Sequence, residues 1–163
     1  MPTQVDTKAV KCRRALKFLT LGDARRDVQS LIAAENAGTL KRLGNWELGQ
    51  TLHHLATWVH FAFDGYPVRP PYLFCLLLKP FKKKFLRGPL PAGIRIPKIP
   101  GGTFGIEPVS TQQGLDELEK AFDRLEHTTP TQDHPIVGPM THDEWVQAHL
   151  RHAELHLGYF IPA

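Results

Sequence analysis

The chain is predicted to be an all-α protein, an antiparallel four-helix bundle with a long proline-rich crossover between its second and third helices. Four stretches repeat apolar residues at helical spacing, and each opens at a residue that can cap a helix. No stretch keeps the strict polar–apolar alternation of a half-buried strand. A chain of 163 residues has room for one domain with a hydrophobic core. We therefore expect a single bundle domain over residues 1–163, with residues 1–13 flexible.

The first two helices have recognisable ends. The first is expected to begin after Thr20, whose hydroxyl can cap it, and to run to Gly38. The second is expected over residues 45–64, with Asn45 as its N-cap, because glycine and proline follow directly. These two helices would form the first half of the bundle.

The other two helices lie in the C-terminal third of the chain. The third is expected to start near Ser110, and its apolar residues at helical spacing are Leu115, Leu118, Phe122 and Leu125. The fourth opens with a capping-box pattern, Thr141 followed three residues later by Glu144, and is expected to reach about Phe160.

Residues 66–109 form the predicted crossover between the second and third helices. Its first part, residues 72–86, is compatible with a short helix that Pro80 interrupts. Its second part, residues 88–105, holds four prolines and several glycines, which favour an extended path over the bundle.

Charge is concentrated in one part of the chain. Residues 65–106 contain eight Lys and Arg and no Asp or Glu, so the rest holds 12 of the 20 basic residues and all 16 acidic ones. A basic surface confined to one segment argues against a nucleic-acid-binding protein. No apolar run approaches the roughly 20 residues of a membrane-spanning helix, so no stable membrane insertion is expected. Two isolated cysteines and no secretory signal indicate the reducing cytoplasm.

The nine histidines of the chain are the strongest functional signal. On a helical wheel of the fourth helix, the apolar arc is formed by Trp145, Ala148, Tyr159 and Phe160. The opposite side carries Glu144, Gln147, Arg151 and Glu154. His149, His152 and His156 fall within the apolar arc, where an unpaired polar group is costly. His152 and His156 are four residues apart, about 6 Å along the axis, so that both rings can bind one metal ion.

A stable site needs a third ligand from another helix. On the second helix, His54 lies at the edge of the apolar stripe, whereas His53 and His60 share a flank outside it. His54 is therefore the predicted third ligand, and His53 is expected to be solvated or to orient a ligand. His149 is open to three interpretations: a fourth ligand, a hydrogen-bond partner of a ligand, or a packing residue. A single core-facing histidine is usually a packing residue. Inward-facing histidines on two helices together favour a metal site.

Several of these residues stand in motifs that resemble a known family. The sequences NWELGQ at residues 45–50, LHHL at residues 52–55 and HAELHL at residues 152–157 resemble the DinB/YfiT-like superfamily of metal-binding helical bundles. Residues 44–58 and 134–145 are similar to an uncharacterised branch of it, domain-of-unknown-function family 1569.

The resemblance implies an up-down-down-up bundle with one metal-binding histidine in the second helix and two in the last. In this sequence these positions are His54, His152 and His156. Relatives include thiol-dependent S-transferases and a mycothiol-dependent isomerase, and some are dimers, so a homodimer is a further expectation. This chain has Leu-Gly-Tyr at residues 157–159 where Arg-Gly-Gln often follows the histidine motif, and its crossover is longer. The resemblance therefore implies a class of chemistry and no particular substrate.

A metal held by three neutral histidines keeps an open position for water or substrate. We expect zinc or nickel, and a metal-dependent thiol S-transferase or hydrolase acting on a small molecule, with a low-molecular-weight thiol as cosubstrate. The alternative is a non-catalytic ligand-binding bundle with structural histidines.

The basic crossover is open to three interpretations. Its cations, which suit a carboxylate-bearing thiol or another anionic substrate, are Lys79, Lys82, Lys83, Lys84 and Arg87. They can equally form a solvated charge run. In the third interpretation, residues 72–78 and the following lysines form an interfacial helix on anionic lipid, although Pro80 interrupts the amphipathic pattern.

Overall fold

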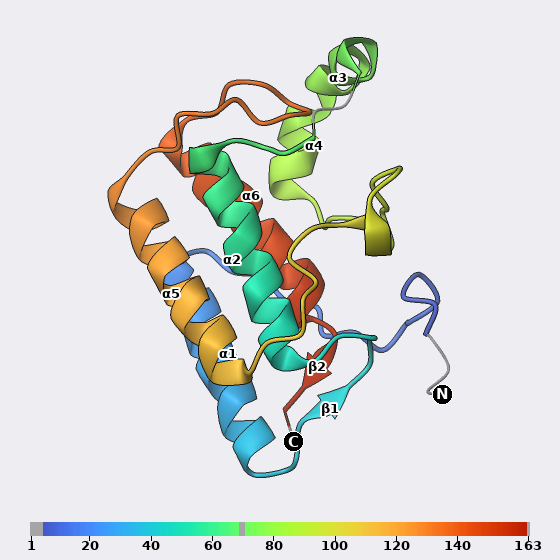
Figure 1. Cartoon of the computed structure of the whole chain (residues 1–163), viewed down its shortest axis with the longest axis vertical. Coiled ribbons are helices and arrows are strands. Elements are labelled where there is room, and N and C mark those ends of the chain that lie inside the picture. The colour runs from blue at the N-terminus through green and yellow to red at the C-terminus, as the bar shows by residue number, and fades with distance from the viewer. Residues whose placement is uncertain (1–4, 69–70, 163) are drawn as a thin grey trace.

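The computed structural model describes residues 5–68 and 71–162, and these are mostly helical with a minimal sheet. The four long helices are α1 (Leu21–Asn36), α2 (Leu48–Asp64), α5 (Thr111–His127) and α6 (His142–Leu157). They lie side by side and pack as a helical bundle, in which α1 and α2 each contact both α5 and α6 (Figure 1). The predicted helical class is confirmed.

Three of the four predicted helix starts are confirmed by their caps. The Thr20 hydroxyl accepts a hydrogen bond from the backbone N–H of Asp23 at 3.1 Å, and the Asp23 carboxylate accepts one from the Thr20 N–H at 2.8 Å. Thr141 and Glu144 form the same reciprocal pair at the start of α6, and the Ser110 hydroxyl caps α5 by accepting the backbone N–H of Gln113 at 3.1 Å. Each cap satisfies N–H groups that the first helical turn leaves without a partner.

The predicted start of the second helix was wrong by two residues. Glu47, not Asn45, is the N-cap of α2, and its side chain pairs with Arg42 instead of capping the helix. The Asn45 side chain is engaged by Val5, whose N–H it accepts at 2.7 Å and to whose carbonyl it donates at 2.9 Å. A partner 40 residues away thus displaced a local capping preference.

The end of the last helix was also misplaced. Helix α6 ends at Leu157, and Phe160 belongs to a short strand, β2 (Phe160–Ile161), that pairs antiparallel with β1 (Lys41–Arg42). Next to this ladder, the Leu43 N–H donates to the Tyr159 carbonyl at 2.8 Å. The backbone after α6 finds these partners in the α1–α2 connection, so Tyr159 and Phe160 lie outside the helical wheel on which we had placed them.

Arg151, on the side of α6 opposite the histidines, is also buried, which the wheel did not predict. The Arg151 guanidinium, 1% exposed, donates to the Phe18 carbonyl at 2.6 Å and pairs with Glu154 at 2.6 Å. Glu154 in turn accepts the Phe18 N–H at 2.5 Å. The segment that precedes α1 therefore covers Arg151 and Glu154, and its backbone pairs with one atom of each charged group, whereas the buried Nε and Nη1 of Arg151 have no partner within the described residues.

Two glycines bring α2 and α5 into close contact. A Cβ added to Gly114 would lie 2.4 Å from the Gly49 carbonyl oxygen, and one added to Gly49 would lie 2.4 Å from the Val109 oxygen. Because only glycine permits this approach, the end of the crossover is held against the start of α2. The crossover therefore runs alongside the histidine-bearing face of α2.

The crossover from α2 to α5 begins with three short helical segments. They are α3 (Tyr72–Leu78), the 3-10 turn η1 (Lys79–Phe81) and α4 (Lys82–Arg87), and a second 3-10 turn, η2 (Pro100–Gly102), follows. The predicted interruption at Pro80 is confirmed, because Pro80 lies in η1. Figure 1 shows α3 at the far end of the molecule, clear of the bundle. Within the described residues, no helix is long and apolar enough to span a membrane.

Candidate metal centre

His54 is fixed by the crossover. It lies in the first half of α2 and is 2% exposed, and its Nδ1–H donates to the Phe104 carbonyl at 2.7 Å. The Gln50 side chain donates to the Ile106 carbonyl, which holds the same stretch of crossover along α2. A histidine whose Nδ1 carries the proton presents a lone pair at Nε2. The Phe104 carbonyl therefore selects the tautomer that binds a metal through Nε2.

The last helix brings two more imidazoles to the same point. His152 and His156, one turn apart on α6, have ring centroids 4.7 Å from each other and 4.9 and 4.6 Å from that of His54. One potential ligand atom from each of the three residues lies within 4.8 Å of the other two. The histidines that sequence analysis selected are therefore together, and within the described residues no other cluster of three His, Cys, Asp or Glu side chains has metal-site spacing.

The spacing of the nitrogens suits one metal ion. The Nε2 atoms of His54 and His152 are 3.1 Å apart. Two nitrogens bound tetrahedrally at 2.0–2.1 Å from a zinc ion are about 3.3 Å from each other. The His54–His152 pair therefore already has nearly the separation of two zinc ligands, and a ligand atom of His156 lies within 4.8 Å of both.

Burial keeps these rings neutral. It lowers the pKa of His54 to about 4, against which the hydrogen bond to Phe104 acts in the opposite direction. Burial also lowers the pKa of His152 and that of His156, and the neighbouring histidines add to the effect. Neutral imidazole is the form that binds metal, so the three side chains are in the correct state at pH 7.

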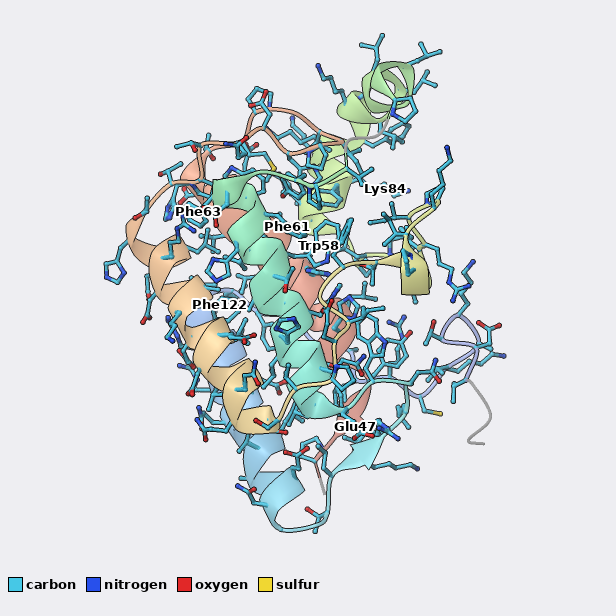
Figure 2. All side chains as sticks on the ribbon, in the orientation of Figure 1. Glu47, Trp58, Phe61, Phe63, Lys84 and Phe122 are labelled. Carbon is cyan, nitrogen blue, oxygen red and sulfur yellow. The ribbon has the colours of Figure 1, made fainter. Side chains whose placement is uncertain are left out.

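Two tryptophans border the cluster. Trp46 stacks on His156, with centroids 5.3 Å apart and planes 10° from parallel, and lies 4.8 Å from His54. Trp58 lies 5.8 Å from His152, on the side of α2 toward the crossover (Figure 2), and its buried Nε1–H has no hydrogen-bond partner within the described part of the chain. Trp46 stands in a family motif, but neither tryptophan was predicted to border the site, although their spacing from His54 along the chain was an available signal.

A pocket of about 80 Å³ opens beside the cluster. It is lined by Thr7, Gly44, Asn45, Trp46, Thr51, His156, Tyr159 and Phe160. One water occupies about 30 Å³ of liquid, so the pocket has room for two or three waters or a small chemical group. It gives solvent and small molecules a route to the His156 edge of the site.

His53 and His149 lie outside the three-histidine cluster. His53 points to the other flank of α2, where its Nδ1 pairs with Glu117 and its Nε2 with Glu107 at 3.3 Å. His149 is buried and stacks on Trp145 with centroids 5.8 Å apart, and its Nε2 has no partner within the described residues. The geometry of His149 is that of a packing residue, the third of the interpretations that its sequence allowed.

The five basic residues predicted to bind an anionic substrate do not line this pocket. Lys82 donates to the Pro139 carbonyl and pairs with Glu144 at 2.7 Å, so it joins α4 to the start of α6. The other four cations, which are exposed, are Lys79, Lys83, Lys84 and Arg87. Their role in binding a substrate remains a prediction.

Comparisons with known proteins agree with the sequence motifs. No curated protein and no solved structure matches the chain significantly. A family model described as "Protein of unknown function (DUF1569)" matches residues 10–163. Because the match spans nearly the whole chain and includes the cluster of His54, His152 and His156, this protein belongs to the DUF1569 family.

Proposed function

We propose that the protein is a DinB/YfiT-like antiparallel bundle in which His54, His152 and His156 bind one divalent metal ion, zinc or nickel, and that the metal serves an enzyme acting on a small molecule. The observation that carries this proposal is the convergence of three neutral imidazoles from two helices on one point. Nitrogen ligands of this kind suit zinc and nickel.

The surroundings of the site support chemistry at an open coordination position. When bound, the metal would supply Lewis acidity that lowers the pKa of a water or thiol in that position. The protein supplies the rest: the Phe104 carbonyl orients His54, and Trp46 shields His156 from one side. The pocket beside His156 admits a small group. This arrangement favours thiol transfer or hydrolysis, and the likeness to thiol-dependent relatives favours thiol transfer.

Metal analysis tests the binding half of this proposal. The purified protein, and protein dialysed with zinc or nickel, should contain about one metal ion per chain. His152→Ala and His54→Ala should contain almost none, whereas His149→Leu should match the unchanged protein. A chain that acquires no metal under either condition would contradict the proposal.

An activity screen tests the catalytic half. Metal-loaded protein is mixed with small thiols, such as cysteine and 2-mercaptoethanol, and a chromogenic aryl halide, and separately with chromogenic esters. Turnover that is absent in His152→Ala would support the enzyme. After a chelator has removed the metal, added metal should restore turnover in the unchanged protein and not in His152→Ala.

A non-catalytic ligand-binding bundle is the second candidate, and the size of the pocket favours it. A space of about 80 Å³ holds a small ligand but only part of a thiol cosubstrate with its electrophile. In that case His152→Ala should lower the melting temperature, and no metal-dependent turnover should be found with any thiol or ester.

A further inference from the structure

An exposed apolar surface lies at the far end of the molecule from the β1–β2 ladder (Figure 1). Four of the eight large hydrophobic side chains that are exposed in the described part of the chain fall within residues 73–81. They are Leu73, Leu76, Leu77 and Phe81, each between 48% and 68% exposed. Scattered exposed apolar residues are normal, but a group of four marks an interaction surface.

The three leucines share one face of α3. Leu73, Leu76 and Leu77 stand at i, i+3 and i+4, an arc of about 100° on the helix. Phe81 continues the group in the following 3-10 turn. Helix α3 therefore presents an apolar stripe to solvent where a helix of the core would present it to a neighbour.

Helix α4 adds cations next to this stripe. Its inner side is fixed to the bundle, because Leu86 is buried, Phe85 packs on His134 and Lys82 pairs with Glu144. Its outer side carries Lys83 and Lys84, which are exposed, and Figure 2 shows Lys84 pointing away from the bundle.

These cations have no counter-charge nearby in the sequence. Lys79 precedes them and Arg87 follows, and both are exposed. Residues 65–106 contain no Asp or Glu. The surface thus combines exposed leucines with four cations for which the described part of the chain supplies no ion-pair partner. Lysine side chains can reach lipid phosphates while their stems lie along apolar surface.

We propose that this surface, hereafter the α3–α4 face, binds an anionic membrane. The face consists of Leu73, Leu76, Leu77, Phe81, Lys79, Lys83, Lys84 and Arg87. The leucines enter the boundary between headgroups and acyl chains, and the cations contact the anionic headgroups. The protein remains peripheral, because the face is two short helices and not a spanning segment.

Charge complementarity favours lipid over a second copy of the chain. Two α3–α4 faces opposed across a twofold axis would bring two sets of cations into one interface, without an intervening acidic residue from this segment. Like charges in such an interface are destabilising. An anionic bilayer presents the opposite charge over its whole surface.

Vesicle co-sedimentation tests the proposal with the full-length chain. We expect the protein to sediment with phosphatidylcholine vesicles containing 30% phosphatidylglycerol at 0.1 M salt, and much less with phosphatidylcholine alone or at 0.5 M salt, where charges are screened. Replacing both Lys83 and Lys84 with Gln should weaken partitioning about 25-fold, at about fivefold per cation. Leu73→Ser with Leu77→Ser should weaken it at least about tenfold.

Matched controls separate the face from total charge and from folding. Lys41→Gln with Lys120→Gln removes the same net charge from exposed residues of β1 and α5 and should leave partitioning unchanged. The melting temperature of every variant should stay within a few degrees of that of the unchanged protein. Vesicle binding does not require metal, so this test can fail while the metal site stands.

Three results would overturn the proposal. One is a failure of the unchanged protein to sediment with anionic vesicles. Another is equal partitioning of the Lys83/Lys84 variant and the Lys41/Lys120 control. The third is a dimer in solution that Leu73→Ser with Leu77→Ser converts to a monomer, since the face would then cover a second copy of the chain.

Discussion

Two groups of imidazoles lie along helix α6, and they differ in where their nitrogens point. In its C-terminal half, His152 and His156 meet His54 of α2, and the Nε2 atoms of His54 and His152 are 3.1 Å apart. The rings are turned edge to face, at interplanar angles of 67° to 82°. One nitrogen of each of the three residues lies within 4.8 Å of the other two.

The second group, formed by His149 of α6 and His134 of the connection between α5 and α6, has a different arrangement. His149 stacks nearly parallel on Trp145, and the ring centroid of His134 lies 5.7 Å from that of Trp145. The His134 Nδ1 accepts backbone N–H groups of Ile136 and Val137 at 3.2 and 3.3 Å. Here both rings pack as aromatic side chains. The His134 Nδ1 accepts hydrogen bonds from the backbone, and the His149 Nε2 has no partner within the described residues.

Burial alone does not distinguish the two groups. It lowers the pKa of His54 and that of His134 to about 4, and the pKa of His149 to about 3. All of these rings are therefore neutral at pH 7. A buried neutral histidine becomes a candidate ligand only when its nitrogen converges with others, and this is the property that mutagenesis can separate.

The largest expected difference between the two groups is in metal affinity. His152→Ala removes one of three ligands and should weaken zinc binding by more than about 100-fold, beyond the range for residues that only orient a ligand. His149→Leu removes a histidine of the other group and should change the affinity by less than about threefold. Competition with a chromogenic chelator measures both, and equal losses would place His149 in the site.

The next effect concerns the orientation of His54. Gly105 has φ +66°, and a Cβ added there would lie 2.6 Å from the Thr57 Oγ1 and 3.2 Å from the His54 Cα. Gly105→Ala should therefore displace the Phe104 carbonyl and weaken zinc binding about 10- to 100-fold. Gly38→Ala is the matched control, because Gly38 has φ +71° and nothing within 4 Å. Both variants should lose about 1 kcal/mol of stability from the strained backbone, and only Gly105→Ala should lose metal.

The outcome of the sequence predictions follows a physical pattern. Features set by neighbouring residues were predicted: three caps, the interruption at Pro80 and the one-turn spacing of His152 and His156. The inward position of His54 was also predictable, because helical periodicity relates it to the apolar stripe of α2. Local rules were sufficient for these features.

Features set by distant partners were not predicted. Asn45 lost its capping role to a contact with Val5, and Arg151 is buried beside the Phe18 carbonyl, to which it donates. The role of Trp46 depends on the packing of the α1–α2 connection against α6. Such contacts join residues 40 to more than 100 positions apart, and no periodicity in the sequence encodes them.

The next largest effect is the pH dependence of stability that the buried ring of His149 causes. The pKa of His149 is lowered by burial to about 3, so the unfolded chain takes up this proton near pH 6.5 while the folded chain does not. Stability from this neutral ring is complete above pH 6.5 and declines by up to about 1.4 kcal/mol per pH unit as the pH falls toward 3. His149→Leu should flatten this decline and, at pH 7, raise stability by about 1 kcal/mol because a buried unpaired nitrogen is removed. Urea unfolding at pH 4.5, 5.5 and 7 measures the slope; equal slopes in both proteins would contradict this account.

The smallest expected effect compares two adjacent histidines on α2. His53 differs from His54 by one position and points to the opposite flank, where Glu107 and Glu117 hold both ring nitrogens. His53→Gln should therefore change zinc affinity by less than about threefold, and it should lower stability by at most about 1 kcal/mol because these ion pairs are partly exposed. The chelator competition and urea unfolding used above measure both quantities. A loss of metal comparable to that of His54→Ala would mean that His53 turns inward when the metal binds. His53 would then be a ligand, although its position on α2 places it outside the apolar stripe.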